Sequence, residues 1–252
     1  KSQKKIKKNL KKNKIKKQII NQAFNFHSQG NISEAAKLYQ YFINQGFKDY
    51  RVFSNYGAIL RSIGRLEAAE LSVRKAIELN PNDAMAHSNL GNILRDLGKL
   101  QDAFDSYLKV IDINPEFSNI YPLITRFIKE SDISQLNKSK LEDILNLLLE
   151  RNDLNHRELI KAFNFLYSNQ IITSLEKLDP DFSNSDLFVN KKIIINALKK
   201  IAFKDMRLEK VLTNLRKHLC NKITKNKEEI SYSQLQFIIA LGEQCFLNEY
   251  IY

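Results

Sequence analysis

A period of 34 residues runs through the sequence from about Gln18 to Pro115. Glycine, alanine and asparagine each recur three times at this spacing, together with an apolar residue, and a proline closes two of the three segments. The recurring residues are Gly30, Gly64 and Gly98; Ala35, Ala69 and Ala103; Asn21, Asn55 and Asn89; Tyr39, Val73 and Tyr107; and Pro81 and Pro115. A repeat of this length is one small unit that must stack on its neighbours to bury its apolar face.

Each unit is expected to be a pair of antiparallel helices. The glycine ends the first helix, because a positive φ is cheap only for a residue without a Cβ. The small alanine allows the second helix to approach the first closely. The proline lies in the turn after the second helix, where its fixed φ and missing N–H prevent the helix from continuing.

The pattern resembles the tetratricopeptide repeat, with units at 16–49, 50–83 and 84–117. The second and third units carry most signature residues: Phe53, Tyr56, Gly57, Leu60, Ala69, Ala76 and Pro81, then Leu90, Gly91, Leu94, Ala103, Tyr107 and Pro115. The first unit departs from the family, with Ala23 in place of the close-packing glycine and Phe47 in place of the proline. The resemblance implies a right-handed solenoid of helix pairs that binds other proteins.

Residues 118–252 are expected to form a degenerate repeat followed by a helical extension. In the register of the repeat, Tyr121 and Ile128 of segment 118–151 are apolar as required, but Asp132 and Asn137 take the glycine and alanine positions. Beyond it, apolar residues three or four apart predict helices around Leu141–Leu148, Leu159–Leu178, Ile194–Ile201, Leu208–Leu219 and Leu235–Phe246, with capping pairs Asn155/Glu158 and Ser231/Gln234. Alternating apolar runs typical of strands do not occur, so the fold class is all-α.

The net charge of +12 is concentrated in one segment. Residues 1–17 contain ten lysines and no acidic residue, which leaves 30 basic against 28 acidic residues in the rest of the chain. We expect a flexible tail or a frayed helix leading into 18–29, because like charges repel. The tail is either a solubilising segment or a site for RNA phosphate or anionic membrane.

The sequence shows no catalytic constellation, no metal site and no cofactor site. Six of the seven glycines lie in the repeats, so a glycine-rich phosphate-binding turn is missing. The four histidines are too far apart in sequence for a zinc motif; His87 is expected to pack. Cys220 and Cys245 are expected to be buried free thiols in a reducing, cytoplasmic compartment. No apolar run is long enough to cross a membrane.

The asparagine row suggests a peptide-binding face. The first helices of stacked pairs line the concave side, so Asn21, Asn55 and Asn89 form a row on it. A side-chain amide can donate to a carbonyl and accept from an N–H of a peptide backbone, and the row resembles the asparagine ladder of O-linked N-acetylglucosamine transferases. The other predicted contacts are Arg51, Ser54, Ala58, Arg61 and Ser62 from the second unit and Met85, Ser88, Asn92, Arg95 and Asp96 from the third. The alternative is that duplicated repeats inherited the asparagines without a function.

The chain ends on apolar and aromatic residues, so we expect more protein to follow Tyr252. Residues 240–250 resemble the segment that joins repeats to the catalytic domain in bacterial repeat-containing methyltransferases. This resemblance implies that the chain recruits a protein substrate for a methyltransferase, or by analogy a glycosyltransferase, domain. The main interpretation remains a scaffold that binds an extended polypeptide.

Overall fold

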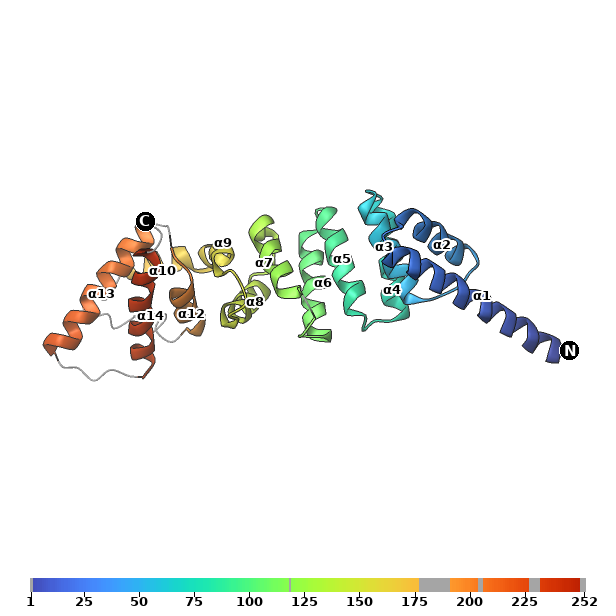
Figure 1. Ribbon diagram of the computed structural model, residues 1–252. Helices are drawn as coiled ribbons and strands as arrows, with labels where there is room; N and C mark the ends of the chain where they lie inside the picture. Colours follow the sequence, from blue (N-terminus) through green and yellow to red (C-terminus); the bar gives the residue numbers. More distant parts are fainter. Residues whose placement is uncertain (1, 118, 177–190, 204–205, 227–231, 250–252) are drawn as a thin grey trace. The chain divides into compact units, whose positions relative to one another are not determined.

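The computed structural model describes residues 2–117, 119–176, 191–203, 206–226 and 232–249 (Figure 1). Helices account for the regular structure in these ranges, and no residue in them forms a strand, which confirms the all-α prediction. The chain divides into two compact units, Lys1–Ile120 and Tyr121–Tyr252.

The first unit consists of three consecutive helix pairs. Their helices are α1 (Ser2–Ser28) with α2 (Ile32–Asn44), α3 (Tyr50–Ser62) with α4 (Leu66–Leu79), and α5 (Ala84–Asp96) with α6 (Leu100–Ile113). The two helices of each pair pack against each other, and successive pairs meet through α2 with α3 and α4 with α5. The first helices α3 and α5 also touch directly, which is the contact expected of helices on the inner side of a stacked array.

In each pair, one glycine makes the turn between the two helices. Gly30, Gly64 and Gly98 have φ values of 75°, 77° and 74°, as the sequence predicted. The residue after each glycine donates its backbone N–H to the carbonyl oxygen five residues before it; for example, the N–H of Arg65 donates to the carbonyl oxygen of Leu60 at 2.9 Å. This is the hydrogen bond of a Schellman motif, and it satisfies a carbonyl that a helix end would otherwise leave unpaired.

Small residues in the first helices let the second helices pack closely. A Cβ added to Gly57 would lie 2.3 Å from Cγ2 of Val73, and one added to Gly91 would lie 2.4 Å from Cε1 of Tyr107. Both distances are far inside van der Waals contact, so the second and third pairs require glycine here. In the first pair Ala23 takes the equivalent place and is fully buried.

The lysine-rich segment continues the first helix, since α1 begins at Ser2. Lys16 Nζ donates to the carbonyl oxygen of Lys48 at 2.7 Å, and Lys12 Nζ lies 5.4 Å from the ring centroid of Phe47. Leu10 is 64% exposed. Of the two sequence-based expectations, residues 2–17 therefore adopt the helical one, and one side of their C-terminal half contacts the turn after α2.

Helices α7 (Ile120–Glu130) and α8 (Lys138–Glu150) come next in the chain and occupy the predicted degenerate repeat. Tyr121 and Ile128 are buried, as the register requires. The connection differs from the repeats: Asp132 has an ordinary negative φ and caps a short 3₁₀ turn, η1 (Ile133–Gln135), and Asn137 caps α8. The residues at the glycine and alanine positions are thus N-caps, and α8 begins later in the register than α6 does in its pair.

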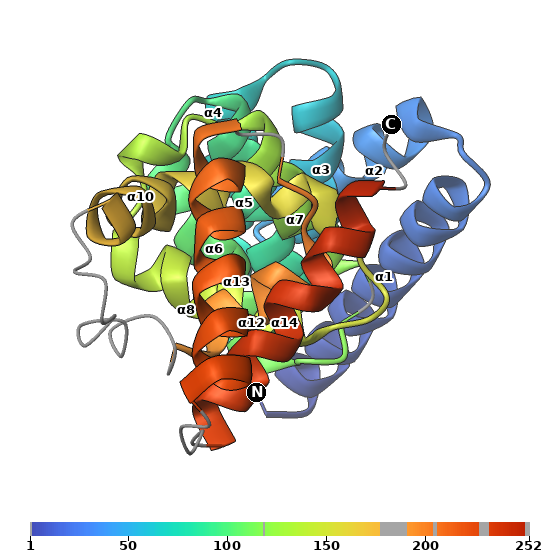
Figure 2. The same cartoon turned by 90° about the vertical axis from the view of Figure 1, so that its left-hand side faces the viewer.

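The remaining described helices match the predicted apolar spacing. They are η2 (His156–Leu159), α9 (Ile160–Phe163), a π-helical turn η3 (Asn164–Ser168) and α10 (Asn169–Glu176), then α12 (Lys192–Lys200), α13 (Met206–Asn226) and α14 (Tyr232–Glu249). Helix α14 packs against both α12 and α13 (Figure 2). A polar cluster joins α13 to α14, where Arg216 donates to the carbonyl oxygen of Leu241 at 3.1 Å and pairs with Glu209 at 2.8 Å.

Three details of the second unit bear on the sequence predictions. Cys220 is exposed rather than buried, and the side chain of Cys245 lies outside the described residues. Asn155 caps η2 through the backbone N–H of Arg157, but Glu158 pairs with Lys129 at 3.0 Å instead of completing the capping pair. Ser231, the side chain of Gln234 and the end of the predicted helix at Leu178 lie outside the described residues. No helix in the described ranges is long and apolar enough to span a membrane.

Candidate peptide-binding face

Helices α3 and α5 present the same stripe of side chains at the same spacing. We call the following eight residues the candidate face: Arg51, Asn55, Ala58 and Ser62 on α3, and Met85, Asn89, Asn92 and Asp96 on α5. The spacing of four, three and four residues keeps each set on one side of its helix. In both helices the outer two residues are exposed and the inner two are partly buried. Asp49 and Asp83, also 34 residues apart, cap the two helices and so begin them at equivalent places.

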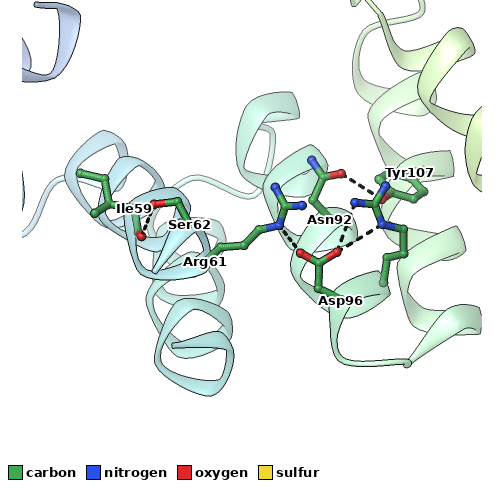
Figure 3. A network of polar contacts seen from close by, with 7 residues as sticks. Ile59, Arg61, Ser62, Asn92, Asp96 and Tyr107 are labelled. Atoms are coloured by element: carbon green, nitrogen blue, oxygen red, sulfur yellow. Dashed lines mark hydrogen bonds and ion pairs between the residues drawn. The ribbon is translucent and has the colours of Figure 1, made fainter. Parts of the chain in front are cut away.

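Two polar links, each a side-chain hydrogen bond, join α3 to α5. Asn89 Nδ2 donates to Ser54 Oγ at 3.0 Å. Further along, Arg61 Nε donates to Asp96 Oδ2 at 2.6 Å. Figure 3 shows Arg61 extending from its helix to Asp96 on the other. These two links fix one first helix against the next, a role that the sequence did not predict for any of these residues.

Ser54 and Ser88 correct the predicted set of contacts. Ser54 is 2% exposed and Ser88 7% exposed, so neither presents a surface to a ligand. The period shows which residues of the repeats are equivalent, but it does not show which of these residues face the neighbouring repeat. A serine at this place is small enough to fit between two helices, and the hydroxyl of Ser54 satisfies the amide of Asn89.

The asparagines of the row use only part of their hydrogen-bonding capacity inside the protein. Asn55 Nδ2 donates to Tyr39 Oη at 3.4 Å, and Asn89 donates to Ser54. The side-chain oxygens of Asn55 and Asn89 accept no hydrogen bond from the described residues, and Asn21 is exposed with no side-chain partner among them. Each of these amides therefore keeps an acceptor and at least one N–H for another molecule.

Buried tyrosine hydroxyls explain why some of the polar residues occur. Tyr39 is fully buried, and its hydroxyl meets Asn55 and, at 3.1 Å, Nδ1 of His27. Burial raises the pKa of Tyr39, and the hydrogen bond with Asn55 partly opposes this. Tyr107 is buried in the equivalent place, and its hydroxyl donates to Asn92 Oδ1 at 3.1 Å, drawn in Figure 3. Asn92, predicted as a ligand contact, thus also serves the core.

Two carboxylates hold Arg51 of the candidate face and the neighbouring Arg61 and Arg95. Arg51 makes a two-pronged contact with Asp49, Nε to Oδ1 at 3.0 Å and Nη2 to Oδ2 at 2.9 Å. Asp96 accepts from Arg61 and, at 3.2 Å, from Nη2 of Arg95. Burial alone would raise the pKa of Asp96, but the hydrogen bonds and charges of Arg61 and Arg95 outweigh it and lower the pKa. Two arginines share one carboxylate here, which leaves a surplus positive charge.

The described residues offer no site for metal chemistry. No group of three or more histidine, cysteine, aspartate or glutamate side chains among them could hold a metal ion. His87 Nε2 lies 2.9 Å from the carbonyl oxygen of Pro81, and His156 Nε2 lies 2.9 Å from that of Arg151. These histidines have local structural partners, and the side chain of His218 lies outside the described residues.

Comparison with known proteins supports the repeat assignment. Two family models described as tetratricopeptide repeat match residues 50–83 and 84–117. These are the second and third predicted repeats, which contain the helix pairs α3–α4 and α5–α6. No curated protein matches the sequence. Among solved structures, the Yersinia enterocolitica type III secretion translocator chaperone SycD is 21% identical, covering 51% of this chain and 90% of its own, with a TM-score of 0.39. MamA protein is 16% identical over 86% of this chain and 96% of its own (TM-score 0.43), and a tetratricopeptide repeat protein from Parabacteroides merdae is 15% identical over 90% and 98% (TM-score 0.45). Residues 50–117 therefore contain two tetratricopeptide repeats within an all-helical, repeat-like fold; such repeats generally serve as modules for protein–protein interaction.

Proposed function

We propose that the first unit binds an extended polypeptide segment along the candidate face. The observation that carries this proposal concerns Asn55 and Asn89, at equivalent places on touching helices: among the described residues, neither has a partner for its side-chain oxygen or for one of its amide N–H groups. Such a pair recognises the N–H and C=O groups of a peptide backbone, which every sequence shares.

The spacing of the helices suits an extended ligand. Packed helices lie about 8–10 Å apart, and an extended chain advances about 3.3 Å per residue. Neighbouring asparagines would then contact the backbone about every three residues, with Asn21 on α1 as a third contact. Arg61 and Arg95 add a preference for carboxylates, since together they exceed the charge of Asp96.

The test must separate a role in ligand binding from the roles that Asn55 and Asn89 have inside the protein. An immobilised peptide library would supply the tightest-binding peptide, whose affinity for the full chain is then measured by fluorescence anisotropy. We expect the double variant Asn55→Ala and Asn89→Ala to weaken binding about tenfold, since each lost hydrogen bond contributes about 0.5–1.5 kcal/mol.

The matched control is the double variant Tyr39→Phe and Ser54→Ala. It removes the same two internal hydrogen bonds and leaves both asparagines in place. We expect it to lose much less affinity than the asparagine variant, because the Arg61–Asp96 link still joins the two helices. If instead the control loses as much affinity as the asparagine variant, the asparagines act only on the structure of the repeats and the proposal is wrong.

A second candidate function concerns the lysine-rich half of α1. Its helical form and the exposure of residues 10–14 present several lysines to solvent without a nearby acid in the segment. We propose attraction of RNA or anionic membrane as this alternative. Binding would be lost when residues 1–17 are removed and would fall steeply as salt rises, because it depends on release of counterions. Peptide binding by the candidate face would survive both changes.

A third proposal follows from the resemblance of residues 240–250 to the segment before a methyltransferase domain. In that case the repeats would present a protein substrate to a catalytic domain on the same polypeptide. The check is whether the parent gene continues past Tyr252 into a strand, a glycine-rich turn and a helix. If it does not, this proposal fails while the peptide-binding proposal stands.

A further inference from the structure

A cavity of about 490 Å³ lies in the second unit, far along the chain from the candidate face. Its wall consists of Lys129, Asn155, Arg157, Glu158, Ile160, Lys161 and Ala202. These residues come from the end of α7, the capped turn η2, the start of α9 and the segment after α12. The volume falls in the range of about 300–1,000 Å³ that is typical of small-molecule sites.

Internal contacts hold one side of the cavity in place. Lys161 Nζ donates to the carbonyl oxygen of Lys129 at 3.3 Å and also to that of Ser131. These carbonyls belong to the end of α7 and the residue after it, where a helix leaves its last carbonyls unpaired. Lys129 Nζ in turn pairs with Glu158 at 3.0 Å. Two of the three cations on the wall are therefore engaged in the structure of the cavity.

Arg157 differs from the other two cations. Its backbone N–H donates to the side chain of Asn155, but its guanidinium makes no hydrogen bond or ion pair with any described residue. The guanidinium presents a planar fork of N–H donors that fits the two oxygens of a carboxylate. His156, the neighbouring residue, adds no charge: burial lowers its pKa, and it contacts the carbonyl oxygen of Arg151.

The rest of the wall is apolar. Ile160 is partly buried, and Ala202 is 5% exposed. The carbon stems of Lys129 and Lys161 add to this surface, because long cationic side chains bury their methylene groups while the charged ends stay near water. The cavity thus combines a positive charge surplus, three cations against Glu158, with an aliphatic side.

We propose that this cavity binds a small organic carboxylate that has a short aliphatic chain. The carboxylate pairs with the Arg157 guanidinium, and the chain lies against Ile160 and Ala202. This site is independent of peptide binding by the first unit.

The test is a titration of the full chain with sodium hexanoate, followed by NMR of the Ile160 and Ala202 methyl groups. We expect saturable shifts of both signals. Arg157→Gln should weaken the binding about tenfold or more, because it removes a charge-assisted bidentate contact. Arg157→Lys should recover part of the affinity, since it restores the charge but not the fork. Arg126→Gln, the same change on the exposed side of α7 outside the cavity, should have no effect.

Two further ligands sharpen the result. Hexan-1-ol has the aliphatic chain without the charge, and inorganic phosphate has the charge without the chain; both should bind more weakly than hexanoate. The proposal is overturned if hexanoate gives no saturable shift, if Arg157→Gln leaves its affinity unchanged, or if hexan-1-ol or phosphate binds as tightly as hexanoate.

Discussion

The helix pairs α5–α6 and α7–α8 follow each other in the chain and show what makes the repeat regular. Between α5 and α6, Gly98 turns the chain with a φ of 74°, and Gly91 leaves room for the ring of Tyr107. Between α7 and α8, Asp132 and Asn137 occupy the glycine and alanine positions of the repeat, and each is the N-cap of the helix that follows it. Helical apolar stripes alone are therefore enough to make successive helices, but the exact geometry of the repeat depends on a few residues without a side chain or with a very small one.

The largest effect is expected where that small side chain admits a neighbour. Gly57→Ala and Gly91→Ala place a Cβ at 2.3 Å from Val73 and 2.4 Å from Tyr107. Each should lower the free energy of unfolding by about 1–3 kcal/mol, the usual cost of overpacking a core. Urea denaturation followed by circular dichroism measures the change. An unchanged midpoint would show that the second helices can move away freely, and the contrast between the two pairs would lose its physical basis.

The turn glycines should show a smaller effect. Gly98→Ala leaves ample space for the methyl group, because nothing lies within 4 Å of the added Cβ. The positive φ nevertheless costs a residue with a Cβ about 1–2 kcal/mol. Asp132→Asn at the corresponding place between α7 and α8 meets no such penalty, since the φ of Asp132 is −75° and asparagine is also a good N-cap residue. The unfolding temperatures of the two variants are compared by circular dichroism. A larger decrease for the variant at position 132 than for the variant at position 98 would contradict our explanation.

Gly242 provides a substitution of opposite sign. It lies within α14, its φ is not positive, and an added Cβ would meet no atom of the described residues within 4 Å. Gly242→Ala should raise the free energy of unfolding by up to about 1 kcal/mol, because alanine has the higher helix propensity. The same denaturation experiment measures it. A loss of stability as large as that of Gly91→Ala would mean that glycine is required for close packing in the second unit too.

The smallest effect concerns the link between α3 and α5. The pKa of Asp96 is lowered in the folded chain, so its ionised form favours folding at neutral pH. This contribution is present above the ordinary aspartate pKa of about 3.9 and is lost as the pH falls through the lowered value. Asp96→Asn should cost less than about 1 kcal/mol at pH 7, because the pair is partly exposed.

The measurement for Asp96 is the difference in unfolding free energy between the two proteins from pH 7 down to pH 3. We expect the difference to shrink as the pH falls below about 4. A difference that stays constant across this range would show that the side-chain shape, rather than the charge of Asp96, joins the two helices.

The periodic residues made most of the first unit predictable. The glycines, alanines and prolines specify turns, close contacts and helix ends through their own backbone or size, so their roles can be read without a structure. The second unit was predictable only as a set of helices. The stripe Leu208, Leu212 and Leu215 is buried as expected. Cys220 lies five residues after Leu215 and thus about 140° around the helix from it, which accounts for its exposure.

The candidate site was less predictable than the fold. The row of Asn21, Asn55 and Asn89 follows from the period, but the internal partners of the asparagines do not. Tyr39 and Ser54 lie 16 and 35 residues from the amides they contact. Such contacts depend on which side of a helix meets the next repeat. Residues on every side of the helix recur with the same period, so the period does not identify that side. A signal was nevertheless present, because a buried tyrosine requires a polar partner for its hydroxyl.

The two links between α3 and α5 also have a consequence for the energetics of recognition. Asn89–Ser54 and Arg61–Asp96 lie at separate places along the same helix contact, so together they oppose both sliding and rotation of one helix past the other. The distance between Asn55 and Asn89 is therefore fixed before a ligand arrives. In the binding that we propose, a polypeptide that matches this distance loses its own freedom, while the protein has little left to lose, and the affinity gains by that difference.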